Sequence, residues 1–297
     1  MSAPPTGQAD QVAGEVGDTR NVVDLLQLRH DGPGRFVAEP HVVNGRRVVE
    51  GSQMLAQALV AASQVVPGRR PVSAWMGFLR VADAAAPLGF ELTELTNGRT
   101  FSALRVDAIQ GDRTCASGNL LLDVTAPDVV RHHVDAAAVP PPEDCPEIDL
   151  GVLGQEVRVV DGAYSGDPDA PVGPPRIDAW VRVQGAPDDP AIGAALLAHF
   201  CGSMSIAAAL RPHAGHGQDD AHRGLSTAVN AISLSLHAAV HPDRWMLYQH
   251  HSTFAGDGIT HSECRVHDED GVLLASFGVD AMVRAAAPSS VDATRVL

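Results

Sequence analysis

The chain has 297 residues, of which 45% are apolar, so it is long and apolar enough to bury one large core or two medium ones. Its formal charge of −15, with only 21 lysines and arginines, excludes a basic surface for a nucleic-acid backbone, so no nucleic acid is expected as a partner. The N-terminus has neither the basic nor the apolar segment of a signal peptide, and no run of 18 apolar residues occurs, so we expect a cytoplasmic protein that does not span a membrane.

Cysteine and histidine usage gives no sign of a metal site. The four cysteines lie far apart without a C-x-x-C pair, which predicts reduced thiols; they are Cys115, Cys145, Cys201 and Cys264. The histidine-rich loop over residues 213–223 matches no standard zinc spacing and predicts a solvated loop. We therefore expect neither a metal nor another cofactor.

The first half of the chain reads as a helix followed by strands. Residues 1–17 lack apolar periodicity and predict a flexible tail. Residues 50–66 carry apolar side chains at i, i+3 and i+4 spacing, which predicts a helix, and residues 72–81 predict a strand. Residues 102–117 alternate on both sides of a Gln-Gly-Asp turn, which predicts a hairpin.

The second half repeats this order. Residues 191–210 predict a single long apolar helix, residues 232–241 a strand, and residues 262–276 a hairpin around a Glu-Asp-Gly turn. Residues 287–297 predict another flexible tail. The helix-then-strands pattern therefore occurs twice, which indicates a duplicated α+β unit.

Local identities support the duplication and set the domain boundaries. Five residues recur at offsets of 160 or 159 positions: Ser102, Arg105, Val106, Ala116 and Ser117 match Ser262, Arg265, Val266, Ala275 and Ser276. Between the copies, residues 129–174 are rich in Pro, Asp and Gly and predict a connector with little regular structure. The predicted domains are thus residues 18–128 and residues 175–286.

Nine short blocks spread over nearly the whole chain carry a family signal. They are LLQLRHDGPGRFVAEP, EGSQMLAQAL, GFLRVAD, GRTFSALRVDAIQ, AWVRVQG, LLAHFCG, LRPH, RWMLYQH and GVLLASFGVDAMVR. In order and spacing, from about Asp18 to Arg284, they resemble the blocks of the acyl-CoA thioesterase II (TesB-like) family. The resemblance implies a double hotdog fold, with two antiparallel sheets each wrapped around a central helix. It also implies hydrolysis of acyl-CoA thioesters in fatty acid metabolism, an acyl-CoA ligand and a homo-oligomer.

The family's water-activating groups are missing at the positions that the resemblance assigns to them. In the family, a carboxylate on the second central helix acts with a hydroxyl and a Gln on nearby strands to activate water. These three positions fall on Gly202, Val229 and Val279. A one-residue shift would reach Asn230 or Asp280, but it turns a strand side chain to the opposite face unless a bulge redirects it. No catalytic group of the family is therefore intact.

The start of the first predicted helix offers substitutes. Glu50 is either a general base beside the thioester or an ordinary acid that complements the helix dipole. Gly51, Ser52 and Gln53 form the first turn, whose free N–H groups can bind the thioester carbonyl. We therefore assign these three residues to substrate binding.

The second predicted helix offers a nucleophile and a base. Ser203 or Cys201 could attack the thioester, with His199 as the base. Alternatively, small residues at this place only permit close packing against the strands, since no G-x-S-x-G motif is present.

Two main hypotheses follow from the sequence. In the first, the protein is a thioesterase in which Glu50, Ser203 or His199 replaces the missing groups. In the second, it is a non-hydrolytic acyl-CoA or acyl-chain binding protein that has kept the pocket and lost the chemistry. A third hypothesis is a structural or regulatory subunit.

Overall fold

The structure is a computed structural model that describes residues 21–42, 47–218, 220 and 224–286. The tails expected at residues 1–17 and 287–297 lie outside the described residues. The helices are η1 (Asp24–Leu26), α1 (Gly51–Val65), η2 (Pro142–Asp144), η3 (Val160–Gly162), α2 (Pro190–Phe200) and α3 (Ser205–Leu210). The strands are β1 (Leu28–His30), β2 (Arg35–Ala38), β3 (Arg70–Phe78), β4 (Leu88–Asn97), β5 (Phe101–Gln110), β6 (Arg113–Asp123), β7 (Glu147–Ile148), β8 (Gln155–Val159), β9 (Arg176–Val183), β10 (Leu225–Leu236), β11 (Met246–Gly256), β12 (Ile259–Asp268) and β13 (Leu273–Ala285).

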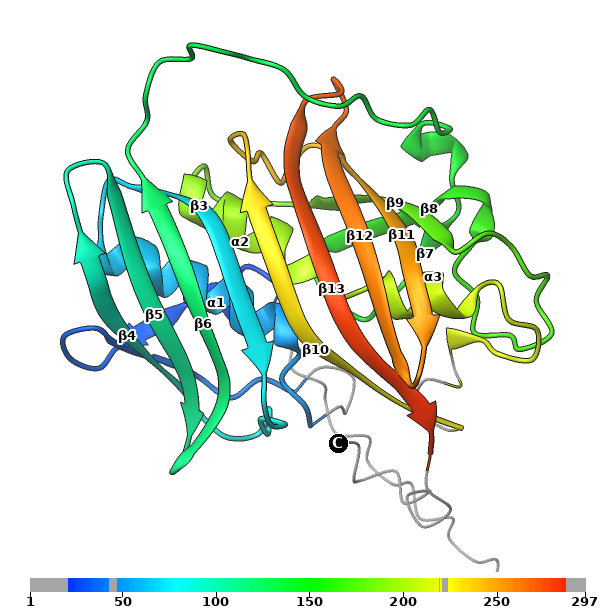
Figure 1. Cartoon of the computed structure of the whole chain (residues 1–297), viewed down its shortest axis with the longest axis horizontal. Helices are drawn as coiled ribbons and strands as arrows, with labels where there is room; N and C mark the ends of the chain where they lie inside the picture. The colour runs from blue at the N-terminus through cyan, green and yellow to red at the C-terminus, as the bar shows by residue number, and fades with distance from the viewer. Residues whose placement is uncertain (1–20, 43–46, 219, 221–223, 287–297) are drawn as a thin grey trace, which may run out of the picture.

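All the described strands belong to one antiparallel sheet. Its order is β1-β2-β4-β5-β6-β3-β10-β13-β12-β11-β9-β8-β7. Strands β3 and β10 pair at the centre, where they lie side by side in cyan and yellow in Figure 1. Outward from this junction, β6-β5-β4-β2-β1 on one side corresponds to β13-β12-β11-β9-β8 on the other. The two halves therefore share one strand order, as the internal repeat predicts.

The central helices lie together on one face of the sheet, behind it in Figure 1. Every residue of α1 from position 52 to 62 is buried, and so is every residue of α2 from position 193 to 200. A helix that is apolar and enclosed on all sides is a core helix. The pairing of β3 with β10 brings α1 and α2 into direct contact.

The predicted connector contributes strands to the sheet, which differs from the expectation for residues 129–174. Strand β8 pairs with β9, and β7 pairs with β8. Val157 and Val159 of β8 are buried at 2% and 0% exposure, so QEVRV has the alternation of an ordinary strand. Because proline and glycine residues surround this five-residue alternation, the sequence alone did not indicate a strand here.

The chain before β7 crosses from one half of the molecule to the other and packs on the C-terminal sheet (Figure 1). The backbone of Ala137 and the side-chain amide of Gln249 exchange two hydrogen bonds, at 2.9 and 3.0 Å. The indole N–H of Trp180 donates to the carbonyl of Pro140 at 2.9 Å. These bonds fix the crossing segment to β9 and β11.

The prediction of a single helix over residues 191–210 is wrong, because four residues separate α2 from α3. The N–H groups of Cys201 and Ser203 each donate to a carbonyl three residues earlier, at 3.0 Å, which tightens the chain into turns. Gly202, a weak helix former, lies between them. The break therefore falls at the position to which the sequence resemblance assigns the family's carboxylate.

The C-terminal sheet stabilises this break. The hydroxyl of Tyr248 donates to the carbonyl of Leu197 at 3.0 Å, and the hydroxyl of Ser262 donates to the carbonyl of Ser205 at 3.2 Å. Backbone carbonyls near the interruption thus gain side-chain donors, as buried polar groups require.

The segment Pro190–Leu210 is also long and apolar enough to cross a membrane by length and composition alone. However, 67% of its most apolar window is buried inside the protein. This burial is typical of a core helix.

Cysteines and potential metal ligands are dispersed. All four cysteines are free and buried. Among the described residues, no group of three or more His, Cys, Asp or Glu side chains is placed to hold a metal ion. Asp219 and His222 of the histidine-rich loop lie outside the described residues.

A buried histidine makes the fold sensitive to acid. His250 is fully enclosed among rings of Phe200, Tyr248 and Phe277, and burial lowers its pKa to about 3. Its Nδ1 lies 3.4 Å from the hydroxyl of Ser205, and its Nε2 has no hydrogen-bond partner among the described residues.

We expect this residue to weaken the fold as the pH falls. Because the unfolded chain binds this proton near pH 6.5 and the folded chain only near pH 3, stability decreases between these values by up to about 5 kcal/mol. Thermal unfolding of His250→Leu should depend less on pH between 6.5 and 4 than that of the wild type. His251→Leu, an exposed neighbour, is the control. Equal pH dependence in all three proteins would contradict the prediction.

Candidate active site

The N-terminus of α1 meets the break between α2 and α3. A Cβ atom added at Gly202 would lie 2.9 Å from Oγ of Ser52 and 3.8 Å from its backbone nitrogen. Two segments 150 residues apart in sequence therefore touch at this point. The contact favours a glycine at position 202, because a side chain there would force the hydroxymethyl group of Ser52 to shift.

Ser52 is a buried hydroxyl at a helix N-terminus. It is 2% exposed, and its Oγ has no hydrogen-bond partner among the described residues. Glu50 is the N-cap residue, and its carbonyl accepts the N–H of Met54 at 3.1 Å. The N–H groups before Met54 therefore have no acceptor within the helix, and they can bind a partial negative charge.

Gly51 permits the tight start of α1. A Cβ atom at this position would lie 2.8 to 2.9 Å from the ring of Phe78 at the end of β3. Gln53 is 9% exposed and lies in the same first turn. The three residues that the sequence assigned to substrate binding thus lie in one turn, in which Ser52 contacts Gly202 and Gly51 packs against Phe78.

His199 is the second-last residue of α2 and lies three residues before Gly202 in the sequence. It is 6% exposed, and its Nδ1 has no hydrogen-bond partner among the described residues. Burial lowers its pKa; the nearby Glu50 opposes this shift, and His41 reinforces it. The imidazole is therefore neutral near pH 7 and able to accept a proton.

The other candidates on this segment are less suitable for the chemistry. Ser203 is half-buried, and its N–H is taken up by the turn. Cys201 is fully buried, and burial raises the pKa of its thiol well above the usual range. Because the thiolate is the reactive form, Cys201 is an inert core residue.

The two valines at the family's strand positions are apolar contacts. Val279 is 1% exposed, and Val229 packs against the core. A bulge does interrupt β10 between Val229 and Ala231, but the extra residue, Asn230, is exposed. Asp280 is also exposed and lies 2.7 Å from His261. The bulge therefore brings no polar replacement into the interior.

Two buried polar residues escaped the sequence reading. His41 is 7% exposed and is an electrostatic neighbour of His199. Thr227, also 7% exposed, lies two positions before Val229 on β10 and so on the same face. His41 belongs to no periodic element, so no sequence pattern indicates that it is buried. The family resemblance assigns the hydroxyl to position 229, and not to position 227.

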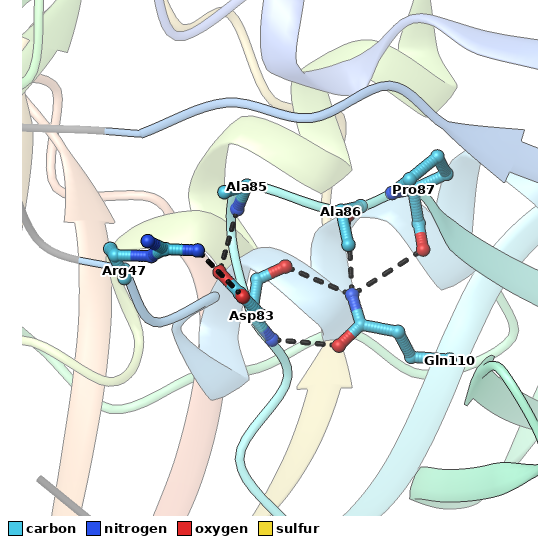
Figure 2. Close-up of polar contacts among 6 residues, drawn as sticks. All are labelled: Arg47, Asp83, Ala85, Ala86, Pro87 and Gln110. Atoms are coloured by element: carbon cyan, nitrogen blue, oxygen red, sulfur yellow. Dashed lines mark hydrogen bonds and ion pairs between the residues drawn. The ribbon is translucent and has the colours of Figure 1, made fainter. Parts of the chain in front are cut away.

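A polar network holds the loop that follows β3 (Figure 2). The side chain of Gln110 accepts the N–H of Asp83 at 2.8 Å and donates to the carbonyls of Asp83 and Ala86 at 2.9 and 3.2 Å. Asp83 also pairs with Arg47 at 3.1 Å. The N–H of Ala85 and the Arg47 guanidinium hold the pKa of Asp83 below its ordinary value.

The same loop positions the chain that leads into α1. The N–H of Val49 donates to the carbonyl of Ala82 at 3.0 Å, immediately before Glu50. The N–H of His41 donates to the carbonyl of Ala84 at 2.8 Å. Gln110 thus fixes, through the loop, both residues that shift the pKa of His199.

Two cavities lie elsewhere. One, of about 360 Å³, is lined by residues of β9, β11 and the crossing segment, and the other, of about 220 Å³, by residues of α3 and the loops beside it. Neither is lined by a residue that the sequence assigned to catalysis or substrate binding, although the second includes His213 and His216 of the histidine-rich loop. We take the α1–α2 contact as the candidate active site, because each of these two helices carries a buried polar atom without a partner among the described residues, Oγ of Ser52 and Nδ1 of His199.

Known protein families match this arrangement. The acyl-CoA thioesterase N-terminal domain matches residues 40–122, and the acyl-CoA thioesterase C-terminal domain matches residues 133–277. The chain belongs to the acyl-CoA thioesterase II (TesB-like) family. Acyl-CoA thioesterase 2 of Haemophilus influenzae is 29% identical over 286 residues, covering 89% of this chain and 97% of the relative. Human acyl-coenzyme A thioesterase 8 is 26% identical, covering 96% and 97%.

Similar solved structures identify the fold. A tesB protein of Mycobacterium avium subsp. paratuberculosis superimposes with a TM-score of 0.75 at 26% identity, covering 88% of this chain and 97% of its own. A hotdog-fold protein of Alicyclobacillus acidocaldarius has a TM-score of 0.70 at 18% identity, covering 89% and 98%. The TesB-like chain is thus a double hotdog, which confirms the expectation from its sequence blocks.

Loss of the Gln110 side chain should loosen the approach to α1. We expect Gln110→Ala to lower the free energy of unfolding by about 2 kcal/mol, because backbone groups of the loop lose their partners. Amides of residues 79–87 should then exchange faster with deuterium. Gln64→Ala, at an exposed glutamine of α1, is the control. Unchanged loop exchange in Gln110→Ala would refute the positioning role.

Proposed function

We propose that the protein hydrolyses acyl-CoA thioesters to free acid and CoA, with His199 as the base in place of the family's carboxylate. One observation carries this proposal. The buried, neutral imidazole of His199, at the end of α2, interacts electrostatically with Glu50, and Glu50 directly precedes the first turn of α1, which contacts Gly202. A base and an anion-binding helix end therefore occur together in a family whose members are named as thioesterases.

Each group of the site has a part in the reaction. His199 accepts the proton of the attacking nucleophile and later returns it to the sulfur of CoA. The free N–H groups in the first turn of α1 stabilise the negative charge that forms on the carbonyl oxygen. Glu50, whose charge favours protonated His199, stabilises the imidazolium.

The three substitutions set the expected rate. One well-placed polar contact in a transition state contributes about 3 kcal/mol, roughly a hundredfold in rate. Gly202, Val229 and Val279 supply no such contact at their positions. We therefore propose slower turnover than in a thioesterase that retains all three groups.

A panel of short- to long-chain acyl-CoA esters tests the role of His199. Wild-type protein should release CoA, and His199→Gln should lower kcat by at least about a hundredfold. The neutral imidazole is the base, and burial lowers its pKa; Glu50 opposes this shift and His41 reinforces it. We therefore expect kcat/KM to keep its neutral-pH value when the pH falls just below 6.5, and to decrease only at lower pH. If the wild type hydrolyses none of these esters, the proposal is refuted.

Restoring the family's groups tests the assignment of the site. Because a side chain at position 202 collides with Ser52, Gly202→Asp with Val229→Thr and Val279→Gln should gain little activity. Adding Ser52→Gly makes room, and the fourfold variant should exceed the threefold one by about a hundredfold. Equal activity of the two variants, both folded by circular dichroism, would contradict this placement.

The alternative is a non-hydrolytic acyl-CoA or acyl-chain binding protein, which the missing groups at Gly202, Val229 and Val279 favour. It predicts binding of acyl-CoA without release of CoA. Isothermal titration calorimetry with an acyl-CoA ester, followed by an assay for free thiol, separates the two functions. Absence of binding heat would exclude the alternative.

We also propose a cytoplasmic homo-oligomer that acts in fatty acid metabolism. The four free, buried cysteines are typical of a reducing compartment and support the first part, and the family resemblance supports the rest. Light scattering coupled to size-exclusion chromatography measures the oligomeric state.

A further inference from the structure

We propose that Ser52 is the nucleophile, and that the acyl group passes through an ester on its hydroxyl before water releases it. This inference rests on the proposed hydrolytic function and names the group that His199 deprotonates. In the family pattern the attacking group is water, held by residues that this chain lacks. The geometry at the N-terminus of α1 points to a different route.

Ser52 occupies the space in front of Gly202. Its Oγ lies 2.9 Å from the point where a Cβ of residue 202 would be. A hydroxyl thus lies next to the place where the family has its carboxylate. This hydroxyl is buried and has no hydrogen-bond partner among the described residues, which is costly unless a ligand supplies one.

An imidazole and a carboxylate accompany this hydroxyl. His199 lies one turn before Gly202, and its Nδ1 is likewise buried and unpartnered among the described residues. Glu50, two residues before Ser52, interacts electrostatically with His199. Hydroxyl, imidazole and carboxylate are the groups of a serine hydrolase. Oγ of Ser52 and Nδ1 of His199 share no hydrogen bond in this structure, so the proposal requires that bond to form when the substrate is bound.

The helix end supplies the oxyanion site. Ser52 lies in the first turn of α1, a helix of 15 residues whose first N–H groups lack intrahelical acceptors. A nucleophile at the start of a helix can use the N–H of the following residue, here Gln53, to bind the oxyanion. The site opens to the surface on the side of Glu50, which is exposed, and of Gly51 and Gly202, which are half-buried.

The reaction balances without any further reagent. Oγ of Ser52 bonds to the thioester carbon while its proton moves to His199; the C–S bond then breaks, and the thiolate of CoA takes that proton. Water next attacks the ester and gives a proton to His199. The C–O bond to Ser52 breaks, and Oγ recovers the proton as the free acid leaves.

Other hydroxyls fit this role less well. Ser203 lies on the α2–α3 break itself, outside the first turn of any helix. Ser205 does face a histidine, His250, at 3.4 Å, but both are buried at 1% and 0% exposure under the rings around His250. Ser205 begins the short helix α3 and His250 lies on β11, so this pair is not at the first turn of α1 with its free N–H groups.

The experiment is an acid quench of full-length protein mixed with a straight-chain four-carbon acyl-CoA, followed by mass spectrometry of the intact chain and its peptides. We expect an adduct of one acyl group on the peptide that contains Ser52. Ser52→Ala should lose the adduct and at least about a hundredfold in kcat. His199→Gln should slow both formation and decay of the adduct.

A stability measurement separates a catalytic role from a structural one. Because Ser52→Ala removes a buried hydroxyl without a partner, its melting temperature should equal or exceed that of the wild type. Ser63→Ala, at a hydroxyl of α1 that bonds the carbonyl of Val60, is the control and should keep its activity.

Each remaining outcome decides a specific claim. Turnover without an adduct, retained in Ser52→Ala, overturns the nucleophile and leaves hydrolysis standing. An adduct on Ser203 also overturns it. An adduct on Ser52 without turnover supports the nucleophile and overturns hydrolysis as the function. Neither adduct nor turnover in the wild type overturns both.

Discussion

The pairing of β3 with β10 is the constraint on which the rest of the molecule depends. It joins two similar halves into one antiparallel sheet and leaves one face on which both central helices must be buried. Because the helices share that face, the start of α1 meets the end of α2. The site is therefore a property of the duplicated fold, since neither half contains both the helix end and the imidazole.

Two buried histidines show how position decides what an imidazole can do. His250 and His199 are both enclosed, and burial lowers the pKa of each. His250 is surrounded by aromatic rings and its polar neighbour is the hydroxyl of Ser205, so among the described residues no charged group lies near it to stabilise a bound proton. His199 lies next to Glu50 and the first turn of α1, so a proton that it accepts gains a compensating charge nearby. The same desolvation thus yields a core residue in one place and a base in another.

The sequence predicted the architecture well because the signals that determine it are periodic and repeated. The alternation in residues 102–117 and 262–276, together with the matched Arg105 and Arg265, revealed the duplicated hairpins. Strand β8 and the break after α2 were missed, because five alternating residues among prolines, and one glycine in an apolar run, are weak local signals. Within the site, the contact of Ser52 with Gly202 depends on the packing of two helices, and no local pattern encodes such a contact.

The complementary fit of Ser52 and Gly202 also constrains the order in which this site could have changed during evolution. A side chain at position 202 and a hydroxymethyl group at position 52 compete for one volume. An ancestor with a carboxylate at position 202 therefore had to lose it before, or together with, the gain of serine at position 52. The reverse order passes through a clash at the helix contact. Chains that carry serine at position 52 should accordingly carry glycine at position 202, so these two positions should covary across related sequences.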